Sequence, residues 1–186
     1  MDHSIAALQL AFLLKEERLG RRRLAERTGL SEMFVRLGLE HLRDRGLVRL
    51  DRQGCELTDE GLRLFSPVLK LVVKAMFVEL NDLRIDVVNL AAQLTGTARV
   101  PAAWKLRDEA IREGASGLVM LSQQDGEWIF SHDQEPLRVQ YLVDAEQLEQ
   151  SFRGGNPNDR LLIVPGPDRN VCTRGLWRAI RAIASL

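Results

Sequence analysis

The sequence has few cysteines and no long apolar run. Its two cysteines, Cys55 and Cys172, are far apart in the chain, so they make neither a disulfide framework nor a zinc site. Isolated thiols favour a reducing compartment, and we expect a cytoplasmic protein. No segment approaches the roughly 18 consecutive apolar residues of a membrane span. The apolar stretch from Ile5 to Leu14 lacks the flanking features of a signal peptide, so we expect no membrane partner.

Patterns typical of catalytic and metal sites are also scarce. Ser131, His132 and Asp133 are consecutive, whereas the three residues of a catalytic triad converge from separate parts of a chain. None of the three histidines has metal-ligand spacing with a cysteine or a carboxylate. We therefore expect no enzyme, no metal and no cofactor.

Charge is balanced overall but uneven along the chain. The 26 basic and 26 acidic residues give a net charge of zero. The segment from Arg18 to Arg52, however, has ten basic and five acidic residues and carries a net charge of +5. Such a segment in a neutral protein indicates a module that binds a polyanion. The alternative is a basic surface that is merely solvated.

Apolar periodicity and capping residues predict the elements of the N-terminal part. A first helix covers about residues 4 to 16, and a short helix from Arg21 to Arg27 ends at the turn Thr28-Gly29-Leu30-Ser31. A longer helix follows from Glu32 to Arg45. A hairpin is predicted within residues 48–57, and Thr58 caps a further helix. This order is that of a winged helix-turn-helix.

Six sequence fragments carry two family resemblances. LAERTGLS (Leu24 to Ser31), EHLRDRGLVRL (Glu40 to Leu50) and CELTDEG (Cys55 to Gly61) resemble winged-helix regulators of the MarR/PadR/ArsR kind. LGRRR (Leu19 to Arg23), with KLRDEAIREGASG and LLIVPGPDRN farther along, resembles archaeal winged-helix proteins that carry a small, uncharacterised α/β C-terminal domain. The resemblance implies double-stranded DNA as a partner.

The second helix of such a motif enters the major groove, and its early residues reach base edges. Arg36 is the best candidate for a guanine contact, and Ser31 at the helix N-terminus is suited to a phosphate. The apolar residues on the same face also fit a second interpretation, in which the winged helix holds a protein or RNA partner. The candidate DNA-binding residues are Arg18, Arg21, Arg22, Arg23, Ser31, Glu32, Met33, Phe34, Arg36, Leu37, Arg43, Arg49 and Arg52.

Pro67 is the predicted domain boundary. We expect a winged helix-turn-helix domain over residues 1–66 and a small α/β domain with a mixed sheet over residues 67–186, in the α+β or α/β class. The predicted elements of the second domain are strand-like runs at 69–80 and 85–92, a helix at 101–113, a hairpin at 117–131 around Asp125-Gly126, a strand at 137–143, a helix at 145–152, a strand at 161–164 and a final helix beginning at 168.

Two segments of the second domain are candidates for ligand binding. The spacing of Trp104, Arg107 and Ile111 places Arg107 on or beside an apolar helix face, where a guanidinium needs a partner. Asp108 is adjacent to Arg107, so the two are expected to face different groups. The alternative is a packed arginine whose head reaches solvent or a distant carboxylate.

The second segment is Asp168, Arg169 and Asn170, which lie between a predicted buried strand and a helix N-terminus. Loops of this kind bind small anions. Asp168 or Asn170 as an ordinary helix cap is the alternative.

A single recognition helix contacts too few bases for strong sequence discrimination, so we expect a homodimer. Ala7, Leu10 and Leu14 form a second apolar stripe on the first helix, which we expect to meet a second subunit or the second domain. The expected protein is a transcription regulator whose C-terminal domain senses a small anionic effector or mediates assembly.

Overall fold

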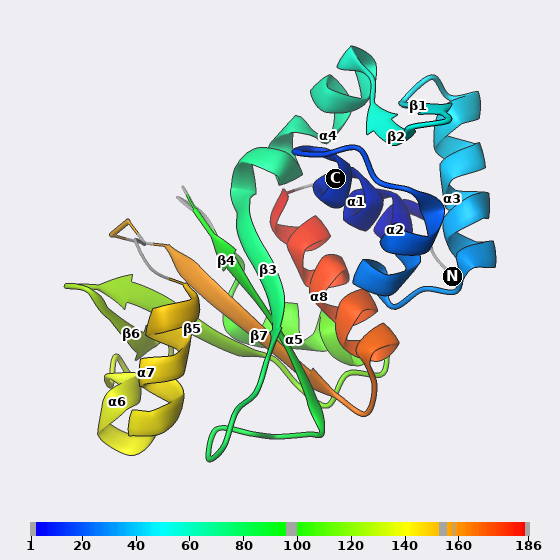
Figure 1. The fold of residues 1–186 in the computed structure, drawn as a ribbon. Helices are drawn as coiled ribbons and strands as arrows, with labels where there is room; N and C mark the ends of the chain where they lie inside the picture. The colour runs from blue at the N-terminus through cyan, green and yellow to red at the C-terminus, as the bar shows by residue number, and fades with distance from the viewer. Residues whose placement is uncertain (1–2, 96–99, 153–155, 158, 185–186) are drawn as a thin grey trace. The chain divides into compact units, whose positions relative to one another are not determined.

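The computed structural model describes residues 3–95, 100–152, 156–157 and 159–184, and the chain divides into two compact units between Lys70 and Leu71 (Figure 1). The predicted boundary residue, Pro67, lies inside a helix instead. A proline removes only one intrahelical hydrogen bond, and the rest of this helix continues past it. No helix in the described part of the chain is long and apolar enough to cross a membrane.

The N-terminal unit is a set of helices with one hairpin. Its elements are α1 (His3–Leu14), α2 (Arg21–Thr28), α3 (Glu32–Asp44), β1 (Val48–Asp51), β2 (Gly54–Leu57) and α4 (Asp59–Leu71). Strands β1 and β2 pair antiparallel, and we call this hairpin the wing. The predicted order of elements is confirmed.

Local chemistry fixes where these helices begin and end. Gly29 ends α2 in the left-handed conformation, with φ 74°, which a glycine adopts without strain. Ser31 Oγ accepts a hydrogen bond from the Phe34 N–H at 3.4 Å and caps α3. Thr58 Oγ1 accepts one from the Gly61 N–H at 3.1 Å at the start of α4. The turn between α2 and α3 is therefore set by residues adjacent in sequence.

Helix α1 packs against α2, α3 and β2 of its own unit. Leu10 is fully buried, and a Cβ placed on Gly38 of α3 would come within 3.0 Å of Leu10 Cδ1. Leu10 is thus part of the core of the N-terminal unit. The stripe of Ala7, Leu10 and Leu14 was predicted to meet a second subunit or the second domain, but Leu10 packs against α3 of its own unit.

The C-terminal unit contains one five-stranded sheet and four helices among its described residues. Its elements are β3 (Val72–Val78), β4 (Val88–Leu94), α5 (Ala103–Ile111), β5 (Val119–Gln124), β6 (Glu127–Phe130), α6 (Leu137–Gln140), α7 (Leu142–Ser151), β7 (Arg160–Gly166) and α8 (Arg169–Ala184). The strand order is β3-β4-β7-β5-β6.

Every pairing in this sheet is antiparallel, so the predicted mixed sheet is corrected while the α/β class holds. Strands β4 and β5 run in the same direction and are joined through α5, as in a parallel crossover. Strand β7 lies between them and is antiparallel to both. The predicted apolar strand, Leu161 to Val164, is fully buried at the centre of the sheet.

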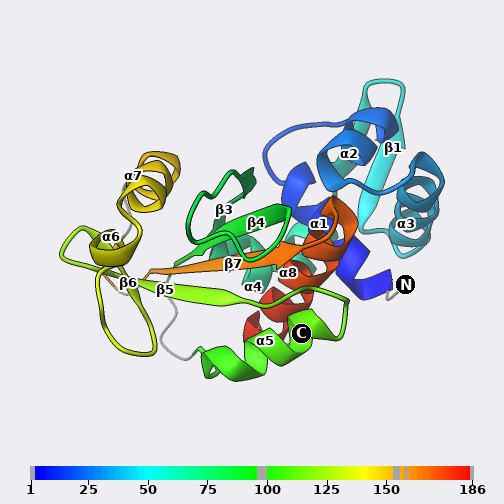
Figure 2. The ribbon, with the colours of Figure 1, turned by 90° about the horizontal axis from the view of Figure 1, so that it is seen from below.

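Helices cover both faces of the sheet. On one face α8 packs on β4 and β7, and α5 packs on α8 and β5 (Figures 1 and 2). Gly175 allows the close approach of α8, since a Cβ there would lie 3.2 Å from the Val164 side chain. On the other face, Leu137 of α6 and Leu148 of α7 join a core with Leu121 and Trp128 of the sheet.

The segment predicted as a strand, 137–143, forms α6 and the first residues of α7. Leu137 is buried, whereas Val139, Leu142 and Val143 are exposed, so the apolar pattern there does not follow burial. The predicted hairpin turn is confirmed, because Asp125 and Gly126 both have positive φ, 51° and 90°.

Candidate nucleic-acid interface

Helix α3 presents one face to its own domain and the opposite face to solvent. Val35, Leu39 and Leu42 are buried, as predicted. On the outward face, Met33 and Phe34 expose 57% and 41% of their surfaces. The predicted recognition face is therefore outward, and its first turns are apolar.

A groove of about 540 Å³ lies between α3 and the wing. We call it the wing groove. Its lining includes four arginines and only two carboxylates, an excess of two positive charges. These six residues are Arg21, Arg36, Arg43, Arg52, Glu40 and Asp51. The folding of residues 20–55 thus brings together basic residues from α2, α3 and the wing.

The four arginines differ in how firmly they are held. Arg36 Nε lies 3.7 Å from Glu40 Oε1, and Arg43 Nη2 lies 2.9 Å from Asp44 Oδ1. Within the described ranges, neither Arg21 nor Arg52 forms an ion pair. Both guanidiniums are therefore available to a polyanion without a competing carboxylate.

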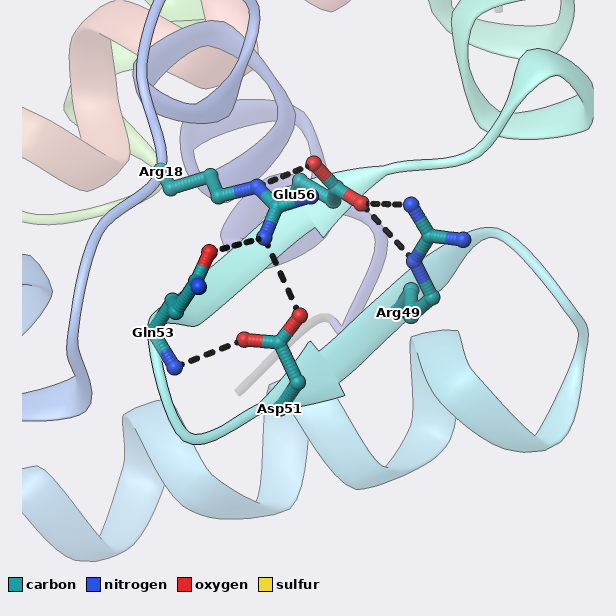
Figure 3. A network of polar contacts seen from close by, with 5 residues as sticks. All are labelled: Arg18, Arg49, Asp51, Gln53 and Glu56. Atoms are coloured by element: carbon teal, nitrogen blue, oxygen red, sulfur yellow. Dashed lines mark hydrogen bonds and ion pairs between the residues drawn. The ribbon is translucent and has the colours of Figure 1, made fainter.

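Arg18 and Arg49, two of the predicted DNA contacts, are instead bound within the N-terminal unit (Figure 3). Arg18 donates to Glu56 Oε2, to Asp51 Oδ2 at 3.1 Å and to Gln53 Oε1 at 2.9 Å. Arg49 Nε donates to Glu56 Oε1 at 2.7 Å. Hydrogen bonds from Arg49 and then Arg18 stabilise the charged carboxylate and lower the pKa of Glu56. Both arginines hold the wing together, and a phosphate would have to displace these bonds.

Arg22 and Arg23 lie on the exposed side of α2. Their guanidiniums approach Glu26 at 3.7 and 3.3 Å, and all three side chains are at least half exposed. Exposed pairs of this kind contribute little to stability. A phosphate bound to Arg22 or Arg23 would therefore displace little stabilising energy. Ser31 serves as the α3 cap, and Glu32 lies in the first turn beside it.

The structure does not bring the candidate ligand residues of the C-terminal unit together. The buried face of α5 contains Leu106 and Ala110, whereas Trp104 and Ile111, which defined the apolar face on or beside which Arg107 was predicted, are exposed. Arg107 has a 54% exposed side chain, and its Nε lies 3.9 Å from Asp108 Oδ1. A solvated arginine needs no buried partner.

The segment before α8 follows the alternative prediction of a helix cap. Asp168 Oδ1 accepts a hydrogen bond from the Val171 N–H at 2.9 Å. The Arg169 guanidinium lies over the Phe77 ring, 4.3 Å from its centroid. Asn170 is exposed in the first turn of α8. In the part of the chain that the structure describes, no group of acidic, histidine and cysteine side chains has the geometry of a metal site.

Comparison with known proteins finds a family that matches most of the N-terminal unit. Residues 9–72 match the family described as the CggR N-terminal DNA-binding domain. This match, together with the helices and the wing of the N-terminal unit, supports a DNA-binding domain of the kind found in transcription regulators.

The whole chain is similar in fold to the solved structure of hypothetical protein PH0730 from Pyrococcus horikoshii OT3. The TM-score is 0.75 with 24% identity, over 97% of this chain and 92% of that one. No curated protein matches.

Proposed function

We propose that the protein is a sequence-specific transcription regulator of the winged-helix type that binds duplex DNA as a homodimer. The wing groove is the observation that carries the proposal. It gathers Arg21, Arg36, Arg43 and Arg52 beside the outward face of α3. An excess of positive charge next to a helix of this motif suits a phosphate backbone that flanks a major groove.

Each residue then has a distinct role. Arg36 pairs with guanine O6 and N7 in the major groove, since a guanidinium donates to both atoms at once. Arg21 and Arg52 contact phosphates on either side and position the helix without selecting a sequence. Two copies of the domain, placed on two half-sites, supply the specificity that one helix lacks.

The C-terminal unit is proposed to carry effector sensing or assembly, with no catalytic step. An effector acts on DNA binding only if it binds one dimer geometry more tightly than another. The small anionic effector inferred from the sequence remains part of the proposal, although Asp168 already caps α8 and the Arg169 guanidinium already lies over the Phe77 ring.

The test is gel retardation with the full chain. We expect random duplex DNA to be retarded at low salt and released as salt rises. We also expect a site selected from a random library to be bound about 10³-fold or more tightly than random duplex. Light scattering on the complex measures the oligomeric state. Failure to retard any duplex at low salt contradicts the proposal.

A second candidate function is an adaptor that holds a protein partner through α3. The exposure of Met33, Phe34 and Leu37 favours it, because apolar helix faces are common at protein interfaces. Under this alternative, Met33→Gln with Leu37→Gln abolishes partner capture and leaves retardation of duplex DNA unchanged.

A further inference from the structure

Strand β3 of the C-terminal unit is an apolar edge strand. It is the terminal strand of the sheet and pairs with β4 on one side (Figure 1). Its sequence, VVKAMFV, contains one charged residue and neither proline nor glycine. Within the described ranges, the backbone of residues 73–78 forms no hydrogen bond except those to β4. The outer side of the strand therefore offers backbone N–H and C=O groups to another strand, as unprotected edges do.

The opposite edge of the same sheet is protected. Strand β6 has only four residues, whereas β3 has seven. The Phe130 N–H donates to the Glu135 carbonyl oxygen at 2.9 Å, and Ile129 forms a β-bridge with Pro136. A short strand, a covering segment and a proline are common means of blocking edge-to-edge pairing. The irregularity of β3 is a shift of its register with β4 near its start, and the pairing is regular over residues 74–78.

The charged residue of β3 does not guard its free edge. Lys74 Nζ donates to the carbonyl oxygen of Ser151 at 2.6 Å and lies 5.6 Å from the centroid of the Phe152 ring. Both partners are at the C-terminal end of α7, which packs on β6 at the other end of the sheet. The ammonium group is therefore held over the α7 side of the sheet, whereas a lysine that blocks pairing projects outward from the edge.

The apolar side chains of β3 are only partly covered. Val73 exposes 46% of its surface, and Ala75, Met76 and Phe77 are half-buried. The neighbouring strand β4 is instead buried from its second residue to its last. A further strand against β3 would remove this apolar surface from water as well as satisfy the backbone of the edge.

A second copy of the same strand fits this edge. A two-fold axis perpendicular to the sheet pairs β3 antiparallel with itself, and opposite residues then lie on the same face, so the axis passes beside one residue. An axis at Lys74 places two ammonium groups opposite each other, which is unfavourable. An axis at Met76 leaves Val73 unmatched, because the partner strand ends first. An axis at Ala75, the midpoint of β3, places Val73 opposite Phe77, a favourable pairing of a β-branched with an aromatic side chain.

We infer that two copies of the chain associate through β3, antiparallel about Ala75, and join their two sheets into one continuous sheet. The homodimer belongs to the proposed function, and its interface is what this inference adds. Helix α4 ends at Leu71 and β3 begins at Val72, so no linker precedes the paired strands. The pairing therefore also brings together two DNA-binding units, as paired half-sites require.

The first test is sedimentation equilibrium of the full chain, which should be dimeric. Ala75→Glu places two carboxylates opposite each other and should raise the dissociation constant of the dimer about tenfold or more. Ala75→Lys should do the same. An equimolar mixture of these two variants should associate more tightly than either alone, because unlike charges are then opposite. Val87→Glu, at a 71% exposed apolar residue between β3 and β4, is the matched control and should dimerise as wild type.

The second test is disulfide crosslinking, which checks the register directly. Opposite residues of an antiparallel pair have Cα atoms about 4.5–5.5 Å apart, within the range of a disulfide. Oxidised Ala75→Cys should therefore run as a covalent dimer on a non-reducing gel. Val73→Cys should not, because its two copies are four residues apart along the strands, roughly 13 Å. Wild type gives the background, since Cys55 and Cys172 are both buried.

A monomeric wild type overturns the inference, as does a dimer that Ala75→Glu leaves unchanged. Ala75→Cys that crosslinks no faster than Val73→Cys also overturns it. If circular dichroism shows that the charged variants are unfolded, the crosslinking decides alone.

Retardation of duplex DNA by wild type is measured in parallel and separates this inference from the proposed function. If duplex DNA is retarded and Ala75→Cys does not crosslink, only this inference fails. If Ala75→Cys crosslinks and no duplex is retarded, the proposed function fails and the β3 interface stands.

Discussion

Arg18 Nη1 donates a hydrogen bond to Asp51 Oδ2 across 3.1 Å and joins the segment before α2 to the end of strand β1. The same guanidinium bonds Glu56 on β2 and Gln53 in the turn, so one side chain contacts both strands and the tip of the wing. An isolated two-stranded hairpin is marginally stable. Arg18 therefore stabilises the wing by linking its two strands and its turn to the segment before α2.

The first prediction concerns this residue. Arg18→Ala removes the link and should lower the melting temperature and speed amide hydrogen exchange over residues 49–56, and DNA binding should weaken as a consequence. Arg22→Ala, which removes an exposed arginine with one weak pair, should leave the melting temperature and the exchange unchanged. Equal exchange in the two variants would mean that Arg18 has no structural role.

The second prediction separates phosphate contacts from bulk charge. Arg21→Gln combined with Arg52→Gln should reduce the slope of log K against log salt by about two units, since each phosphate contact contributes about 0.9. Arg63→Gln on α4 removes the same kind of charge outside the wing groove and serves as the control. A slope that falls equally in the control would show only a loss of overall charge.

The third prediction concerns a buried carboxylate in the C-terminal unit. Asp144 is fully buried and accepts hydrogen bonds from the N–H groups of Asn81, Asp82 and Leu83 at 2.7, 2.9 and 2.7 Å. Asp144→Ala leaves these three donors without their acceptor and should cost about 3 kcal/mol or more of unfolding free energy. Urea denaturation measures the loss. Glu146→Ala, an exposed position on the same helix, should change it by less than about 0.5 kcal/mol.

Features set by neighbouring residues were predictable from the sequence. The Ser31 and Thr58 caps, the Gly29 helix end and the Asp125-Gly126 turn depend on a few adjacent residues, and each is present. The Arg49–Glu56 ion pair was also predictable from the sequence. A turn at residues 52–53 places these two residues opposite each other in the hairpin, as observed.

Features set by distant contacts were not predictable. The position of β7 between β4 and β5 determines that the sheet is antiparallel and brings Arg160 opposite Ser122. No local sequence pattern specifies that β7 lies between β4 and β5. Likewise, which face of α5 is buried depends on α8, whose Arg178 bonds Glu109 across 69 residues of sequence. The apolar Trp104 and Ile111 therefore indicated the wrong face.

The fourth prediction is a pH effect at the contact between α5 and α8. The hydrogen bond from Arg178 Nε to Glu109 Oε2, at 2.9 Å, stabilises the carboxylate and lowers the pKa of Glu109 from its ordinary 4.5. A lowered pKa contributes stability that is complete above the ordinary value and is lost as pH falls through the lowered one. Glu109→Gln should therefore reduce stability at neutral pH and flatten its decline below about pH 4.5. Glu146→Gln is the control, and an unchanged acid profile in Glu109→Gln contradicts the prediction.

The last prediction tests whether α3 selects a DNA sequence. Arg36 is outward, and its nearest described carboxylate oxygen, in Glu40, is 3.7 Å from Nε, so its fork is free to reorient toward a base. Arg36→Ala should reduce affinity for a selected site by about 1–3 kcal/mol and relax the preference at one base pair, with little change for random duplex. Arg36→Lys keeps the charge but loses the two-pronged donor, so it should bind random duplex as wild type does and still lack the discrimination at that base pair. Competition binding with single-base variants of the selected site measures both quantities. If Arg36→Lys discriminates as well as wild type, Arg36 acts as a point charge on a phosphate, and sequence selection must come from other side chains of α3.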